Sequence, residues 1–188
     1  MNHLATSKED ILAASRDLIK ENGWAAVSIR AVASRCSVSA GTIYNYYESK
    51  ADLLSDTIES IWHEIFFHPE DEQVFHDVES CISWIYERLE YGNRQFPGFF
   101  SLHSFGFMRD EKTSGKKRMM KTWGHILNGL CEVLENDPKV RADVFDQEFT
   151  EKKFADILFS LILVSMIRQD YDPSSVLMLV KKTLYVTV

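Results

Sequence analysis

Residues 28–54 read SIRAVASRCSVSAGTIYNYYESKADLL, and this stretch decides the fold of the first part of the chain. Ser28 and Ser39 each precede a short run of helix-forming residues, where a serine hydroxyl can accept a hydrogen bond from an unpaired amide of the first turn. The spacing predicts two short helices, over 29–35 and over 40–46 or 47. Two helices joined by so tight a turn make a helix-turn-helix.

The residues between and within the two helices suit close helix packing. Ala33 is small where the helix axes are expected to cross, and Val38 and Ile43 are apolar and can fill the space beneath the crossing. The opposite face of the second helix is then free to enter the major groove of DNA.

A further helix is expected on each side of this stretch. Upstream, Ser7 with Asp10 three residues later makes a capping-box pattern, apolar residues follow at helical spacing, and Gly23 is a stop signal. Downstream, SKAD at 49–52 repeats the Ser-x-x-Asp pattern and begins a helix that continues to Phe67.

The rest of the sequence carries more helical patterns, separated by breaks. Apolar residues recur at helical spacing over 78–89 and 120–134, and a Pro-Gly pair at 97–98 interrupts an aromatic segment between them. Residues 154–167 read FADILFSLILVSMI and are apolar on nearly all sides, while an Asp-Pro pair at 172–173 starts a last helix.

These patterns predict an all-α chain with about nine helices and two domains. We expect a three-helix helix-turn-helix head over 1–50, a linking helix over about 50–67, and a second helical domain over 68–188. The composition agrees, because 8 Gly and 4 Pro in 188 residues leave little scope for a turn-rich β-protein.

Cysteine spacing and hydropathy indicate the cellular compartment of the protein. Cys36, Cys81 and Cys131 are widely spaced and contain no CxxC pair, so neither a disulfide framework nor a thiolate metal site is indicated. No basic and apolar leader and no apolar run long enough to span a bilayer is visible, so we expect a cytoplasmic protein with no membrane partner. No cofactor is expected.

Taken over the whole chain, the net charge opposes binding to a polyanion. The formal charge is -7, yet residues 1–50 hold 6 Lys and Arg against 5 Asp and Glu, a net of +1, and residues 51–188 hold 15 against 23, a net of -8. The acidity therefore belongs to the second domain, and the head remains compatible with DNA.

From Ile29 to Leu54 the sequence resembles the TetR-type (TetR/AcrR) helix-turn-helix regulators. The shared pattern is an apolar-Ala pair, a turn, a small-Gly-Thr-apolar-Tyr core, an aromatic pair and Ser-Lys-x-x-Leu-Leu, and the likeness covers about residues 7–65. Ser37 is the one departure, since many members have glycine there, and this implies a left-handed backbone that serine adopts less readily. The resemblance implies a transcriptional regulator and not an enzyme, most often a repressor that a small-molecule effector releases from a near-palindromic operator in double-stranded DNA.

The resemblance also implies which residues face DNA: Ser28, Arg30, Ala40, Gly41, Thr42, Tyr44, Asn45, Tyr46 and Lys50. Physical chemistry sorts them into roles. Thr42, Tyr44 and Lys50 suit phosphate contacts, whereas Arg30 and Asn45 suit guanine and adenine edges. Tyr46 is compatible with a base edge, a phosphate contact or packing, and Tyr47 is expected to be a core anchor.

For the second domain the resemblance implies effector binding and dimerisation. A pocket for an apolar or aromatic effector could be lined by Trp84, Phe96, Phe99, Phe100, His103, Phe107, Met120 and Trp123, although ordinary core packing explains each of these residues equally well. The last two helices, over about 150–186, are expected to form a homodimer interface. The histidines include no pair at helical metal-ligand spacing, so no metal site is expected.

Three alternatives stay open. The second domain could bind a partner protein in place of a small molecule. An all-helical enzyme is a further possibility, although the sequence contains no phosphate loop, HExxH or GxSxG. Finally, Cys36 beside the turn could be a redox-sensitive thiolate or an inert, partly buried thiol.

Overall fold

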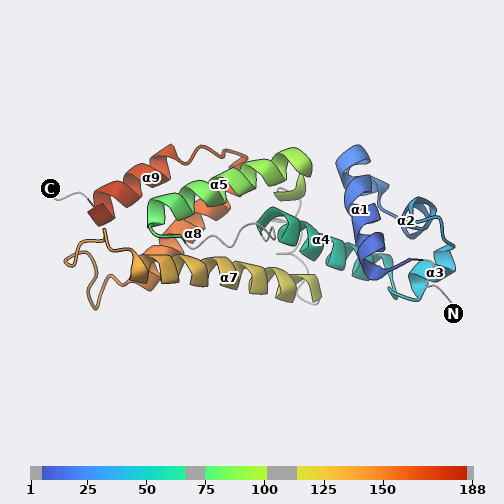
Figure 1. Cartoon of the computed structure of the whole chain (residues 1–188), viewed down its shortest axis with the longest axis horizontal. Coiled ribbons are helices and arrows are strands. Elements are labelled where there is room, and N and C mark those ends of the chain that lie inside the picture. The colour runs from blue at the N-terminus through green and yellow to red at the C-terminus, as the bar shows by residue number, and fades with distance from the viewer. Residues whose placement is uncertain (1–5, 67–74, 101–113, 186–188) are drawn as a thin grey trace. The chain divides into compact units, whose positions relative to one another are not determined.

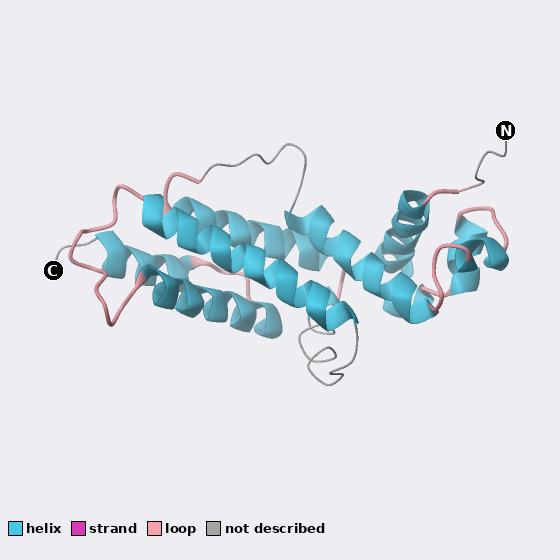
Figure 2. Cartoon of the chain, turned by 90° about the horizontal axis from the view of Figure 1, so that it is seen from below, coloured by secondary structure: helices cyan, strands magenta, loops and turns pink. Residues whose placement is uncertain are grey.

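A computed structural model describes residues 6–66, 75–100 and 114–185, with the backbone alone described over 114–122. This described part contains eight α-helices, a 3-10 turn at Trp24–Ala26 and a π-helical turn at Lys181–Tyr185, and it contains no strand (Figures 1 and 2). The expected all-α class is confirmed. The expected count of about nine helices concerned the whole chain, of which 101–113 lies outside the described residues.

Contacts divide the chain into two compact units. The head is Met1–His68 with Arg94–Gly98, and the C-terminal unit is Pro69–Asn93 with Phe99–Val188. The helices of the head are α1 (Lys8–Asn22), α2 (Ile29–Arg35), α3 (Ala40–Tyr44) and α4 (Lys50–Phe66). Those of the C-terminal unit are α5 (Val78–Gln95, except its last residues), α7 (Ser114–Asn136), α8 (Glu151–Arg168) and α9 (Ser174–Val180).

The helices of the head begin where the sequence predicts. Ser7 and Asp10 form the expected capping box, and the Ser28 and Ser39 hydroxyls accept hydrogen bonds from the amides of Ala31 and Thr42, both at 3.1 Å. Helix α1 packs on α2 and α4, and α2 packs on α3. The shared core contains several fully buried apolar side chains: Ile11, Ile19, Val32, Ile43, Leu53 and Ile61.

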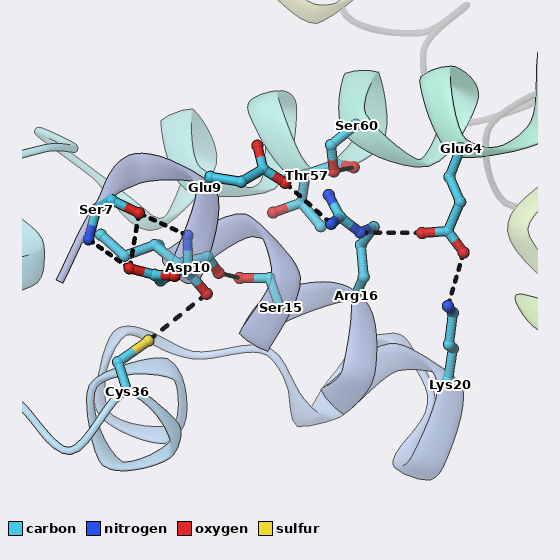
Figure 3. A network of polar contacts seen from close by, with 11 residues as sticks. Ser7, Glu9, Asp10, Ser15, Arg16, Lys20, Cys36, Thr57, Ser60 and Glu64 are labelled. Carbon is cyan, nitrogen blue, oxygen red and sulfur yellow. Dashed lines mark hydrogen bonds and ion pairs between the residues drawn. The ribbon is translucent and has the colours of Figure 1, made fainter. Parts of the chain in front are cut away.

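A row of ion pairs joins α1 to α4 (Figure 3). Arg16 Nε lies 3.0 Å from Glu64 Oε2, and Lys20 Nζ lies 2.7 Å from Glu64 Oε1. Near the other end of the contact, Lys8 Nζ lies 2.6 Å from Asp56 Oδ2. Because Arg16 and Glu64 are largely shielded from solvent, their pair is screened less than an exposed pair. We infer that α1 and α4 behave as one rigid piece.

Several helix boundaries differ from the runs of residues read from the sequence. Helix α8 begins at Glu151, before the apolar run, because the Thr150 hydroxyl caps it by accepting a bond from Lys153 N at 3.3 Å. Helix α5 continues to Gln95 and ends before the Pro-Gly pair, where Gly98 has φ 79°. Helix α3 ends at Tyr44. The amides that follow donate hydrogen bonds to carbonyls three residues earlier, which is the pattern of a tighter 3-10 turn.

A buried carboxylate holds three segments of the C-terminal unit together. Asp137 follows α7 and accepts hydrogen bonds from Val78 N at the start of α5 (3.0 Å), from Lys139 N (2.9 Å) and from the Tyr185 hydroxyl near the chain end. The buried amide of Val78 would otherwise be left without a partner. The carboxylate therefore fastens the start of α5 and the π-helical turn to the end of α7.

Asp77, next to this junction, leads us to predict an acid-sensitive contribution to stability. Its carboxylate accepts from Lys139 Nζ at 2.7 Å and from the amide and hydroxyl of Ser80, and these bonds lower its pKa from 3.8 to about 2. A carboxyl with a lowered folded-state pKa adds stability that is complete above its unfolded value and is lost as the pH falls toward the folded value. Asp77→Asn should therefore cost about 1–2 kcal/mol at neutral pH.

The measurement is the free energy of unfolding in urea at several pH values. The gap between wild type and Asp77→Asn should shrink as the pH falls from about 5 toward 2. A gap that stays constant over this range would show that the carboxylate charge contributes nothing.

Candidate nucleic-acid interface

The turn between α2 and α3 has the geometry that the sequence predicts. Ser37 lies in the left-handed region with φ 56°, and Val38 N donates to the Ala33 carbonyl at 2.9 Å. Ala33 and Ile43 are buried at the helix crossing. The helix-turn-helix is therefore closed by a backbone that glycine would adopt more easily than the serine present.

We predict that Ser37→Gly stabilises the head. A left-handed backbone costs a residue with a Cβ about 1 kcal/mol, and the greater freedom of unfolded glycine cancels part of the gain. The expected net rise in unfolding free energy is a few tenths to about 1 kcal/mol. The matched control is Ser34→Gly in α2, where helical backbone makes glycine unfavourable, so stability should fall. Equal effects of the two substitutions in urea unfolding would contradict the prediction.

The residues predicted to face DNA differ in their exposure. Five are exposed: Arg30, Gly41, Tyr44, Asn45 and Lys50. Four are half-buried: Ser28, Ala40, Thr42 and Tyr46. Within the part of the chain that the structure describes, Arg30 has no ion-pair partner. Helix α3 and the start of α2 thus present a cation, an amide and a phenol, which are groups suited to phosphates and base edges.

Gly41 has no requirement for glycine inside the head. A Cβ added there would meet the Ser39 hydroxyl oxygen at 3.5 Å, an ordinary contact, and the backbone needs no positive φ. The residue is also exposed. Its lack of a side chain therefore leaves room for a close approach from outside.

The two tyrosines after Asn45 are held within the head. Tyr47 is buried, as expected for a core anchor, and Lys8 Nζ lies 5.8 Å from its ring centroid. The Tyr46 hydroxyl donates to the backbone carbonyl of Thr6 at 2.6 Å. Sequence reasoning identified neither Thr6 nor Lys8, because no local pattern connects residues about forty positions apart.

The sequence of this helix-turn-helix is similar to that of known proteins. The family model described as bacterial regulatory proteins, tetR family, matches residues 11–57. The chain carries a tetR-family N-terminal domain. A curated relative, the HTH-type transcriptional regulator UidR of Escherichia coli K12, is 38% identical over 48 residues, which are 26% of this chain and 24% of the relative. The match thus spans about a quarter of that relative, and UidR of Shigella flexneri matches to the same extent.

Solved structures share the fold over nearly the whole chain. A transcriptional regulator from Rhodococcus sp. Rha1 has a TM-score of 0.69 at 17% identity and covers 97% of this chain and 100% of its own. FadR from Bacillus subtilis, in complex with stearoyl-CoA, has 0.64 at 16%, covering 93% and 97%. Reduced NemR of E. coli has 0.65 at 17%, covering 96% and 99%. At these identities the likeness concerns the fold.

Cys36 lies beside the turn of the tetR-family domain and is half-buried. Its Sγ lies 3.8 Å from the Asp10 carbonyl oxygen, and burial raises the pKa of the thiol (Figure 3). A thiol with a raised pKa holds little thiolate at neutral pH and reacts slowly. The structure therefore favours the inert alternative for this cysteine.

The candidate effector residues lie in several places. Phe96 is buried in the head unit, with Lys20 Nζ 4.9 Å from its ring centroid. In the C-terminal unit, Phe99 and Phe100 are buried and pack on each other, Trp84 contacts Phe75, and Trp123 contacts Phe159. His103, Phe107 and the side chain of Met120 lie outside the described residues. A pocket formed by the whole set remains a prediction.

The described residues offer neither a metal site nor a membrane span. Among residues 6–66, 75–100 and 114–185, no group of three His, Cys, Asp or Glu side chains is placed to hold a metal ion. No helix in the same ranges combines the length and apolar character needed to cross a bilayer.

Proposed function

We propose that the chain is a cytoplasmic DNA-binding transcriptional regulator that acts as a homodimer on a near-palindromic operator, most often as a repressor. The proposal assigns DNA binding to residues 1–50, with α4 as the link, and effector binding and dimerisation to 68–188. The observation that carries it is the tetR-family match over 11–57 on a helix-turn-helix whose α3 face is exposed.

Within this proposal each exposed residue has a role. Arg30 and Asn45 read base edges in the major groove, and Tyr44 and Lys50 contact phosphates together with Thr42. Three others, Ser28, Ala40 and Gly41, border the groove and allow the backbone to approach DNA closely, and Tyr46 is considered separately below. Because residues 1–50 carry a net charge of only +1, two copies of this segment must bind together to give useful affinity.

Dimerisation is supported by an exposed apolar face on the last two α-helices. On α8 one face is buried by Phe154, Leu158 and Ile162, while large apolar side chains also stand exposed on the helix. The exposed ones on α8 and α9 are Ile157, Val164, Ile167, Met178 and Leu179. An exposed patch of this kind on a helix pair is typical of an interface, and a second copy of the chain covers it in our proposal.

The effector is proposed to be an apolar or aromatic small molecule bound in the C-terminal unit. FadR from Bacillus subtilis, which shares the fold, forms a complex with stearoyl-CoA, and this supports a small molecule here. Binding would favour one arrangement of α4, and the ion pairs from α4 to α1 would move α1 and the helix-turn-helix with it. Control by a partner protein is the competing possibility, and native mass spectrometry of the purified chain separates the two by the mass of what is bound.

Selection from a pool of random DNA duplexes tests the function. The full-length chain should enrich a near-palindrome whose half-sites lie about one helical turn or somewhat more apart. Affinity for the enriched duplex should fall steeply between about 50 and 200 mM salt, as phosphate contacts require. Failure to enrich any sequence at low salt would overturn the proposal.

A further inference from the structure

Two tyrosines, one at the end of α3 and one just after it, differ in the hydrogen bonds that they can form with DNA. Helix α3 is the helix proposed to enter the major groove. Tyr44, the last residue of α3, is 56% exposed. Tyr46 is half-buried, and its hydroxyl donates to the Thr6 carbonyl at 2.6 Å. A phenol has one hydrogen to donate, and a phosphate oxygen can only accept. Tyr46 could therefore donate to a phosphate only after breaking its bond to Thr6.

The acceptor of this bond lies in a fixed and protected place. Thr6 is 6% exposed and directly precedes Ser7, the N-cap of α1. Ser7 is held in turn by Asp10, whose carboxylate accepts from Ser7 N at 2.8 Å and whose amide donates to the Ser7 hydroxyl at 3.1 Å. A rigid, buried carbonyl that loses its donor stays partly unsatisfied, so the bond is worth more than an exposed one.

The same turn of α1 is also attached to α4. Lys8 Nζ lies 2.6 Å from Asp56 Oδ2 and 5.8 Å from the ring centroid of Tyr47. The start of α1 therefore contacts the segment after α3 through Tyr46 and the helix α4 through Lys8. Helix α3 itself has five residues, too few to be stable or to hold an orientation without such contacts.

We propose that Tyr46 is a positioning residue for DNA recognition. Its hydroxyl fixes the C-terminal end of α3 to the start of α1, while Ile43 and the α2 contact fix the rest of the helix. Tyr44 and its neighbours then meet DNA at a set angle. The inference rests on the proposed function, and it assigns to Tyr46 neither a base contact nor a phosphate contact.

The first arm of the test compares Tyr46→Phe with Tyr44→Phe on the operator and on an unrelated duplex. Tyr46→Phe should lower operator affinity about 3- to 10-fold, the usual effect of one lost hydrogen bond, with affinity for the unrelated duplex unchanged. The preference of Tyr46→Phe for the operator base should weaken by a similar factor at every position of the half-site. Tyr44→Phe, as a phosphate contact, should lower both affinities by similar factors.

Other outcomes of this arm overturn the inference. Equal losses of Tyr46→Phe on operator and unrelated duplex would make Tyr46 a phosphate contact. Loss of preference at a single base pair would make it a base reader. Unchanged affinity on both duplexes would leave it without a role in binding. All measurements are made where both variants are fully folded by circular dichroism, so an effect of unfolding does not enter.

The second arm needs no DNA and therefore separates this inference from the proposed function. In Tyr46→Phe, backbone amides of the first turn of α1 and of α3 should exchange hydrogen faster than in wild type, because the bond that joins them is lost. In Tyr44→Phe exchange should be unchanged. If exchange is also unchanged in Tyr46→Phe, the positioning role is wrong. If the wild type binds no duplex, the proposed function is wrong, and this arm still tests the junction.

Discussion

Arg30→Ala is expected to lower the affinity of the chain for its operator by about 1–3 kcal/mol for each half-site. Arg30 is the second residue of α2, it is exposed, and it has no ion-pair partner among the residues described. Its guanidinium can therefore form two parallel hydrogen bonds to a guanine edge without giving up an internal contact. The loss of affinity should be largest for operators that have guanine at the base pair that Arg30 contacts.

The control for this substitution is Arg35→Ala at the other end of the same helix. Arg35 is exposed and pairs with Glu21, which leaves its charge occupied within the head. The control should change operator affinity little and leave base preference intact. Quantitative binding to a set of operators with single base-pair changes checks both variants. Unchanged selectivity in Arg30→Ala would remove this residue from base reading.

The head could be predicted from sequence because its signals are local. The capping serines at 7, 28 and 39 precede their helices by one residue, and Ser37 has the left-handed backbone implied by the glycine that many TetR-type regulators have at this position. Apolar spacing then identifies Ile43 and Tyr47 as core residues, and both are buried. Each of these signals acts over a few residues, which is the range at which backbone chemistry decides structure.

The features missed from sequence depend on contacts between distant residues. The bond from Tyr46 to Thr6 joins positions 40 apart, and the bond from Val78 N to Asp137 joins positions 59 apart. Neither has a local pattern, since tyrosine and aspartate are common at exposed helix ends. The π-helical turn at Lys181–Tyr185 was missed as well. There the Leu184 carbonyl accepts from Arg141 N and Tyr185 reaches Asp137, so tertiary contacts accompany the change of helix type.

Within the proposed function, the contacts of α1 also bear on how an effector signal would reach DNA. Glu64 and Asp56 of α4 bind Arg16, Lys20 and Lys8 of α1, so a displacement of α4 is shared by α1. The Tyr46 hydroxyl, just after α3, in turn donates a hydrogen bond to the backbone at the start of α1. A signal would thus reach α3 through α1, and a domain held in this way would move without internal rearrangement.

Val164→Glu is expected to abolish the proposed homodimer at micromolar concentration. Val164 is 45% exposed on α8, and Ile157 and Ile167 lie seven residues before and three after it, on the same side of the helix. In a two-fold interface both copies of the chain carry the substitution, so two carboxylates would be buried or placed near each other. Removing charges from water into an apolar contact costs several kcal/mol, which should raise the dimer dissociation constant at least about 100-fold.

The control is Asn128→Glu, which adds the same charge at an exposed position of α7. Sedimentation equilibrium should give a dimer for wild type and this control, and a monomer with unchanged helical content for Val164→Glu. Because each head contributes only modest affinity, the monomer should also bind a palindrome no better than a single half-site. A Val164→Glu protein that remains dimeric would require the partner copy to sit on another face, and the exposed apolar side chains of α8 and α9 would then need a different occupant.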